Sequence, residues 1–293
     1  MKRRVTLSNK TEGVFTAIDY KKKKYKTVYV IMFAILLIAA LATFFPIFWL
    51  LMTSFKTVEE LFASSYSFWP DSISWSRVTE VWGVTNFSRA YINSLIVVGG
   101  AVVVSVVANG LLAFVLSIVR PKGHRAVFVL IMMGYMIPPI TGMIPLFVTL
   151  RNMQLIDTFV PPILMFGANA FYLVMFKSYM ESLPKAIFEA AEVDGAKMMT
   201  VFFKIVFPLS LPIVGVIAIL TATAAWNDFL FQYLILRSDS VQTVIVRLFH
   251  LNRAAGMYQH IYMAMMLATL PLIVLFLIFQ RQITSTVTTS GIK

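Results

Sequence analysis

The chain has 293 residues, of which 59% are hydrophobic and only 13% charged, and its mean hydropathy is +0.82. Soluble domains carry about 25% charged residues, so this composition argues against an ordinary soluble protein and indicates a protein of the lipid bilayer. The net charge of +12 does not indicate a nucleic-acid partner, because much of it lies beside apolar segments, as the positive-inside rule describes.

Six stretches are long and apolar enough to cross the ~30 Å hydrocarbon core, which takes about 20 helical residues. They are Val28–Thr53, Tyr91–Val119, Ala126–Leu150, Phe159–Met180, Leu209–Leu236 and Met257–Ile283. We therefore predict an all-α polytopic membrane protein with six transmembrane helices. Residues 1–27 form a basic N-terminal segment, 28–283 the transmembrane domain, and 284–293 a C-terminal tail. Proline should kink span one at Pro46 and span three at Pro138-Pro139 and Pro145.

The distribution of Lys and Arg predicts the orientation of these spans. The first 27 residues hold nine basic residues, four of them in the run 21–24. With the N-terminus inside, 18 of the 25 basic residues fall on the cytoplasmic side and 7 outside. Both termini are therefore predicted to be cytoplasmic. The lysine run is expected to attract anionic membrane lipid rather than nucleic acid.

The longest outer connection, Lys56–Ala90, is rich in aromatic residues. Two interpretations stay open: an aromatic belt at the membrane interface, or an external surface that touches a partner. The residues concerned are Tyr66, Phe68, Trp69, Trp75 and Trp82.

The cytoplasmic segment 181–207 is helical in pattern but too polar in its first half to span the membrane. Ser182-Leu183-Pro184 is typical of a helix start, since Ser can cap and Pro is tolerated in the first turn. We expect a short helix over Lys185–Asp194, ended by Gly195 in a left-handed conformation. A second helix, Ala196–Phe207, should present Met198, Phe202, Ile205 and Val206 on one face, and Pro208 opens the next span.

Such a helix pair is either an amphipathic element at the membrane interface or a rigid docking element on which a cytoplasmic motor protein exerts force. In the second interpretation, Ala190 and Ala191 keep the backbone close to the docked partner. Glu189 and Glu192, one turn apart, anchor on its basic or amide groups.

The spacing in this segment resembles the cytoplasmic signature of binding-protein-dependent ABC importer permeases. That signature is Glu-Ala-Ala, three residues, Gly, nine residues, Ile, one residue, Leu-Pro. The chain has Glu189-Ala190-Ala191, Gly195, Ile205 and Phe207-Pro208 at those distances. The one departure, Phe207 in place of Leu, is an apolar exchange.

Weaker motifs resemble the carbohydrate branch of that family, in particular the smaller maltose-type permease. They are Asn93-Ser94-Leu95, Trp226-Asn227-Asp228-Phe229, and the ending that runs from Gln280-Arg281 to Thr288–Lys293. In that ending Ser290 replaces a Gly and the final Gly is missing. The resemblance covers nearly the whole chain.

The resemblance implies a permease in a bacterial cytoplasmic (inner) membrane that pairs with a second, homologous permease. Two ATP-binding subunits and an extracytoplasmic solute-binding protein complete the importer, which carries a sugar by alternating access. By matching position, the ATPase-coupling residues would be Glu189, Ala190, Ala191, Asp194 and Gly195.

The chain itself carries no motif for catalysis. It has no Gly-x-x-x-x-Gly-Lys-[Ser/Thr] phosphate loop, no nucleophile elbow and no cysteine, and its three histidines lack metal-ligand spacing. We therefore predict a transport subunit rather than an enzyme, with no metal site and no cofactor of its own. ATP and Mg²⁺ would be bound by the partner ATPase.

Polar residues inside the predicted spans are candidates for the solute path. Asp228 is the most notable, because an acid within a span is costly, although a hydrogen bond to a neighbouring helix is an equally good reading. The other candidates are Asn109, Thr141, Asn169, Trp226, Asn227 and Gln232.

Two alternatives to a sugar importer stay open. The same machinery could carry another solute, including an acidic oligosaccharide such as an oligouronate. An ion-coupled secondary transporter would instead need paired intramembrane charges and inverted repeats, and neither is evident in the sequence.

Overall fold

The computed structural model describes residues 23–63, 67–253 and 258–290, and within them it contains helices and no strands. The predicted all-α fold is confirmed. The N-terminal segment up to residue 22, Tyr66 and the last three residues lie outside the described residues. Three helices are long and apolar enough to cross a membrane, and up to six spans result if each bent helix pair counts as one.

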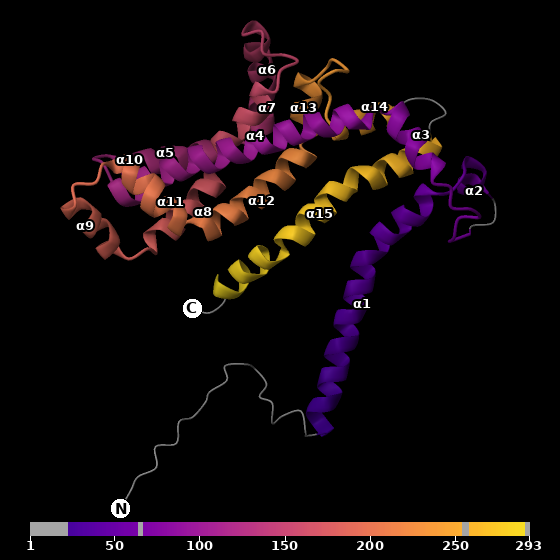
Figure 1. Ribbon diagram of the computed structural model, residues 1–293, viewed down its shortest axis with the longest axis horizontal. Coiled ribbons are helices and arrows are strands. Elements are labelled where there is room, and N and C mark those ends of the chain that lie inside the picture. Colours follow the sequence, from indigo (N-terminus) through magenta and orange to yellow (C-terminus); the bar gives the residue numbers. More distant parts are fainter. Residues whose placement is uncertain (1–22, 64–66, 254–257, 291–293) are drawn as a thin grey trace, which may run out of the picture.

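The elements follow one another along the chain as short and long helices (Figure 1). They are α1 (Lys23–Ser54), α2 (Val58–Phe62), α3 (Ser76–Val84), α4 (Phe87–Phe114), α5 (His124–Tyr135), α6 (Met143–Asn152), α7 (Val160–Leu164), α8 (Ala170–Glu181), α9 (Lys185–Val193), α10 (Met198–Val201), α11 (Phe207–Leu209), α12 (Leu211–Asn227), α13 (Leu230–Ile235), α14 (Val244–Arg253) and α15 (Tyr258–Ser290). Two π-helical segments, Val115–Val119 and Phe202–Val206, and two 3₁₀ turns, Pro139–Gly142 and Met165–Gly167, complete the set.

The long helices α1, α4 and α15 confirm predicted spans one, two and six. Helix α4 packs against α8 and α12, and α15 packs against α1, α12 and α14. The small residues of α4 that face its neighbours are buried, among them Ala101, Ser105 and Ala113. Their small side chains let the helices approach closely, as is common where helices meet in a membrane. Helix α1 continues as one helix through Pro46.

The other three predicted spans are broken, and this corrects the sequence-based bounds. The axes turn by 84° between α5 and the stretch Pro139–Asn152, by 43° between the stretch Val160–Gly167 and α8, and by 79° between the stretch Met198–Leu209 and α12. The first break lies at Pro138-Pro139, as predicted. Pro145 causes no break because it lies in the first turn of α6, where its missing N–H costs nothing.

The start of span five is also corrected. Pro208 does not open it but lies within α11, and the bend falls at Ser210, before α12 begins at Leu211. Pro212 explains the position, since it lacks the N–H that would reach the carbonyl of Pro208 and its ring crowds that group. The helix of this span ends at Asn227, and within the predicted remainder Leu230–Ile235 form the separate short helix α13.

The two ends of the bundle carry different short elements (Figure 1). Helices α9, α10 and α11 gather at one end, and α2, α3 and α14 at the other. The core nearest α9 is aromatic, with Phe114, Phe176 and Phe202 buried and the rings of Phe114 and Phe202 centred 5.3 Å apart. This contact packs the end of α4 against the π-helical segment Phe202–Val206.

Candidate functional site

Helix α9 begins after Pro184 and ends in a hydrogen-bonded cap that the sequence predicted. Gly195 has a φ of +67°, and its amide donates to the carbonyl of Glu192 at 3.0 Å. The next amide, Ala196, donates to the carbonyl of Ala191 at 3.0 Å. These two bonds form a Schellman motif, which satisfies carbonyls left over at the helix end.

The predicted capping role of Ser182 is wrong. Its hydroxyl donates to the carbonyl of Tyr179 at 2.6 Å and so closes α8 instead of starting α9. The N-cap position of α9 is taken by Pro184, two residues after Ser182, and no side chain caps this helix.

Helix α9 has one face against the core and one face free. Ala191 is buried and Phe188 packs on the core, whereas Glu189 and Ala190 are exposed and Val193 is 86% exposed. The free face therefore presents a small, flat and partly acidic surface at the end of the bundle.

The predicted second helix of this segment is divided into α10, a π-helical segment and α11. Phe202 and Val206 are buried and Ile205 packs against the core, as expected. Met198 is 55% exposed and does not share that face, because α10 begins there, beyond the end of the core.

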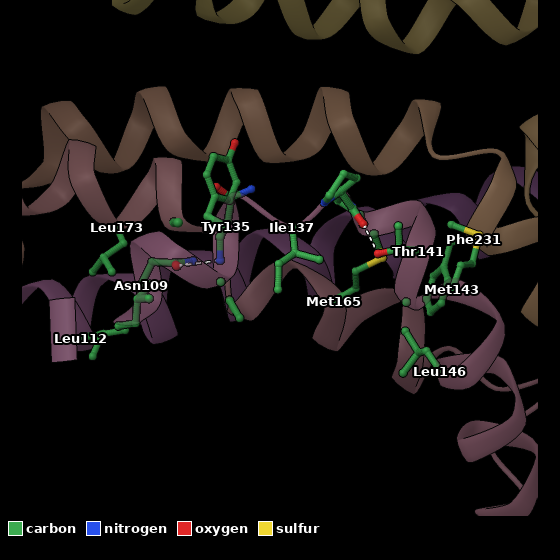
Figure 2. Close-up of a pocket in the computed structure, with 18 residues that line it drawn as sticks. Asn109, Leu112, Tyr135, Ile137, Thr141, Met143, Leu146, Met165, Leu173 and Phe231 are labelled. Carbon is green, nitrogen blue, oxygen red and sulfur yellow. Dashed lines mark hydrogen bonds between the residues drawn. The ribbon is translucent and has the colours of Figure 1, made fainter. Parts of the chain in front are cut away.

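A cavity of about 640 Å³ opens where spans three and four break. Residues of α4, α5, α6, α8 and α13 and of the two 3₁₀ turns line it, and Figure 2 shows these side chains. Most of the lining is apolar, and its polar side chains are Asn109, Tyr135, Thr141 and Asn169. The lining contains no charged side chain.

Asn109 joins α4 to the break between α7 and α8. Its side-chain amide donates to the carbonyls of Ser105 at 2.8 Å and Phe166 at 3.3 Å, and its Oδ1 accepts from the backbone amide of Asn169 at 3.1 Å. Asn169 in turn caps α8, since its Oδ1 accepts from the amide of Tyr172 at 3.1 Å. The structure thus brings these two predicted residues together.

Thr141, a third predicted candidate, also lines this cavity, whereas Trp226, Asn227, Asp228 and Gln232 do not. The indole N–H of Trp226 donates to the carbonyl of Ala268 at 3.2 Å, and buried Gln232 donates to Ala225 at 2.7 Å and accepts from Thr243 at 2.6 Å. These contacts hold α12, α13 and α15 together.

Asn227 and Asp228 lie at the end of α12. Asn227 is exposed and its side-chain amide donates to the carbonyl of Thr223 at 2.9 Å. Asp228 is half-buried at the break that follows α12, and its carboxylate faces the backbone amide of Phe231. Both residues thus sit where α12 gives way to α13, outside the cavity.

Asp157 is a residue that sequence analysis missed. Its Oδ1 accepts from the amides of Arg237 at 2.6 Å and Ser238 at 2.8 Å, and its Oδ2 accepts from the Ser238 hydroxyl at 2.6 Å. Burial raises the pKa of this carboxyl, but the hydrogen bonds from Ser238 and Arg237 outweigh it and hold the pKa below its usual range. The contact ties the loop before α7 to the end of α13. The only signal for it in the sequence is a single acidic residue in the short connection between predicted spans three and four.

Comparison with known protein families decides the class of this fold. Residues 110–289, more than half of the chain, match the family described as binding-protein-dependent transport system inner membrane component. The chain belongs to this family. It is a permease subunit of an inner membrane rather than an enzyme, and the family works with ATPase and solute-binding subunits.

Several relatives of this permease are named sugar transporters. The melibiose/raffinose/stachyose import permease protein MelC of Bacillus subtilis is 32% identical over 260 residues, 87% of this chain and 94% of the relative. The arabinooligosaccharides transport system permease protein AraQ of the same organism is 30% identical over 253 residues, 85% and 90% of the two chains.

A solved structure shares the fold of this permease. It is a crystal structure of a bacterial ABC transporter involved in the import of the acidic polysaccharide alginate. The TM-score is 0.78 at 23% identity, over 89% of this chain and 98% of the other.

Proposed function

We propose that this permease moves a sugar or oligosaccharide across the cytoplasmic membrane, taking it from a solute-binding protein and driven by separate ATPase subunits. The named sugar permeases among its relatives support the solute class. Membership of a binding-protein-dependent family argues against the ion-coupled secondary transporter.

The observation that carries this proposal is the free face of α9. Its residues Glu189 and Ala190 are exposed at the end of the bundle, while Ala191 and the cap at Gly195 fix the helix to the core. A helix held in this way moves as a rigid body, so force from a docked ATPase reaches α8 and the helices that follow. Asp194, the capping residue, is exposed on the same end.

The placement of α9 also supports cytoplasmic termini. The described N-terminal end of α1 and C-terminal end of α15 both lie away from the end that carries α2, α3 and α14 (Figure 1). The excess of Lys and Arg on the α9 side agrees with the positive-inside rule.

The cavity at the broken spans is the part of the solute path that this chain contributes. The Asn169 side-chain amide and the Thr141 hydroxyl lie at its wall and suit the hydroxyl groups of a sugar, while Asn109, whose side-chain N–H groups donate to carbonyls, holds that wall in place. Because the lining lacks charged side chains, we favour a neutral sugar over an acidic oligosaccharide. Cations for an acidic solute would have to come from elsewhere in the importer.

A second, homologous permease would complete the path. Along most of its length α1 exposes large apolar side chains, including Phe33, Ile38 and Phe44 at 67%, 67% and 69%. Lipid or a neighbouring subunit must cover this surface, and an importer built from two permeases supplies such a neighbour. ATP and Mg²⁺ belong to the ATPase subunits in this arrangement.

The test of the proposal is charge reversal at the coupling helix. Glu189→Lys should leave the protein in the membrane while reducing both ATPase retention and solute uptake, because it places a cation against the partner's basic or amide groups. Glu59→Lys, the same reversal at an exposed residue of α2, should change neither. Normal ATPase retention together with normal uptake in Glu189→Lys would reject the proposed coupling role.

A further inference from the structure

A second cavity, of about 370 Å³, lies at the end of the bundle that we assign to the cytoplasm. It is formed where α4 ends, α5 begins and α8 ends. Its charged or titratable lining residues are Arg120, His124, Arg125, Lys177 and Glu181. The function proposed above makes no use of this cavity.

The charges in this cavity are not balanced. Oε1 of Glu181 accepts from Lys177 at 2.7 Å and from Arg120 at 3.2 Å, so one carboxylate serves two cations. The ammonium of Lys177 also lies 5.2 Å from the ring centre of Phe128. Arg125 has no ion pair or hydrogen bond to any residue that the structure describes. Three cations face one carboxylate, so the lining has a net charge of +2 and favours an anion.

The backbone at Arg120 supports a binding role for this side chain. Arg120 has a φ of +49°, in the left-handed region that costs a residue with a side chain about 1–2 kcal/mol. It directly follows the π-helical segment Val115–Val119, and such segments occur frequently at functional sites. Strain of this kind persists where the surrounding structure fixes the conformation, and here the amide of Arg120 donates to the carbonyl of Val115 while its guanidinium donates to Glu181.

An apolar strip leads away from the same cavity along α5. Val129, which lines the cavity, is 47% exposed, and Leu130 and Met133 are 66% and 58% exposed. A ligand that satisfies both features has an anionic head for the basic residues and hydrocarbon chains for the strip.

We infer that this cavity binds the phosphate headgroup of an anionic phospholipid of the cytoplasmic leaflet, with Arg125 as its free cation and its acyl chains along α5. Basic pockets between transmembrane helices on the cytoplasmic side suit such headgroups. The inference rests on the orientation given under the proposed function. Glu181 also lines a smaller cavity beside Glu189 and Glu192 of α9. A lipid bound in the basic cavity would therefore stabilise the position of the coupling helix.

The inference can be tested by native mass spectrometry of the full chain in detergent. The sample contains equal amounts of phosphatidylglycerol and phosphatidylcholine with identical acyl chains. We expect one phosphatidylglycerol to be retained in preference. Arg125→Gln should lower that preference about fivefold, since one basic residue near an anionic lipid contributes about 1 kcal/mol.

Lys122→Gln is the matched control, because Lys122 is exposed in the turn just before α5 but does not line the cavity. It should leave the lipid preference unchanged. An equal loss in both variants, or no preference in the parent protein, would overturn the site. Displacement of the lipid by an equal concentration of glycerol phosphate or inorganic phosphate would show a soluble-anion site instead. None of these readouts depends on uptake, so failure here is distinct from failure of the coupling role.

Discussion

Replacing Gly195 by alanine tests how far coupling depends on the rigid end of α9. No atom lies within 4 Å of the position that a Cβ would occupy, so the cost comes from the backbone alone. A φ of +67° costs an L-residue about 1–2 kcal/mol relative to Gly. That energy shifts the balance between the capped and the frayed helix end about 5- to 30-fold.

The assay is co-purification of the ATPase subunits with the permease, followed by solute uptake in proteoliposomes. Gly195→Ala should weaken both, while insertion into the membrane stays normal. Gly195→Asn is the matched control, because Asn tolerates the left-handed conformation better, and it should recover most of the loss. The reasoning is refuted if alanine has no effect, or if asparagine is as harmful as alanine.

Further predictions concern packing, pH and the solute path. Gly100→Ala would place a Cβ 2.6 Å from Cδ1 of Ile163, so it should cost about 1–3 kcal/mol of stability, and adding Ile163→Val should restore part of the unfolding midpoint. Asp157 stabilises the fold above its unfolded pKa, and this contribution is lost as pH falls through its lower folded pKa. Asp157→Asn should therefore flatten the acid side of a plot of unfolding midpoint against pH, and an unchanged plot would count against it. Asn109→Ala should lower thermal stability, because it leaves buried polar groups unpaired at a cost of about 1–3 kcal/mol each. A variant with lowered uptake but unchanged thermal stability would contradict the structural role of Asn109. Asp228 lies outside the cavity, so Asp228→Ala should leave uptake kinetics unchanged in an assembled importer, and altered kinetics would return this residue to the solute path.

The sequence predicted the long elements well because hydrocarbon thickness is a strong constraint. Helices α1, α4 and α15 lie where apolar runs of 20 or more residues placed them. The cap at Gly195 was equally predictable, since only a residue that accepts positive φ ends a helix in that way.

The parts that sequence analysis missed depend on contacts between distant segments. Helices α2, α3 and α14 have 5, 9 and 10 residues, too few to give a span and too polar to stand out from a loop. The hydrogen bonds of Asp157 join residues about 80 positions apart, which no local pattern encodes. The solute-path candidates were chosen for polarity alone, and packing separated Asn109 and Asn169 from Trp226 and Gln232.

The most direct test of the central claim uses a single introduced cysteine, because the natural chain has none. Val193→Cys on the free face of α9 and Trp75→Cys near α3 are both highly exposed positions, at 86% and 73%. A membrane-impermeant maleimide should label Val193→Cys only from the cytoplasmic side, and bound ATPase should block the reaction, whereas Trp75→Cys should react only from outside. Labelling of Val193→Cys from outside, or unchanged labelling with the ATPase bound, would contradict the account of α9 as the coupling helix of this permease.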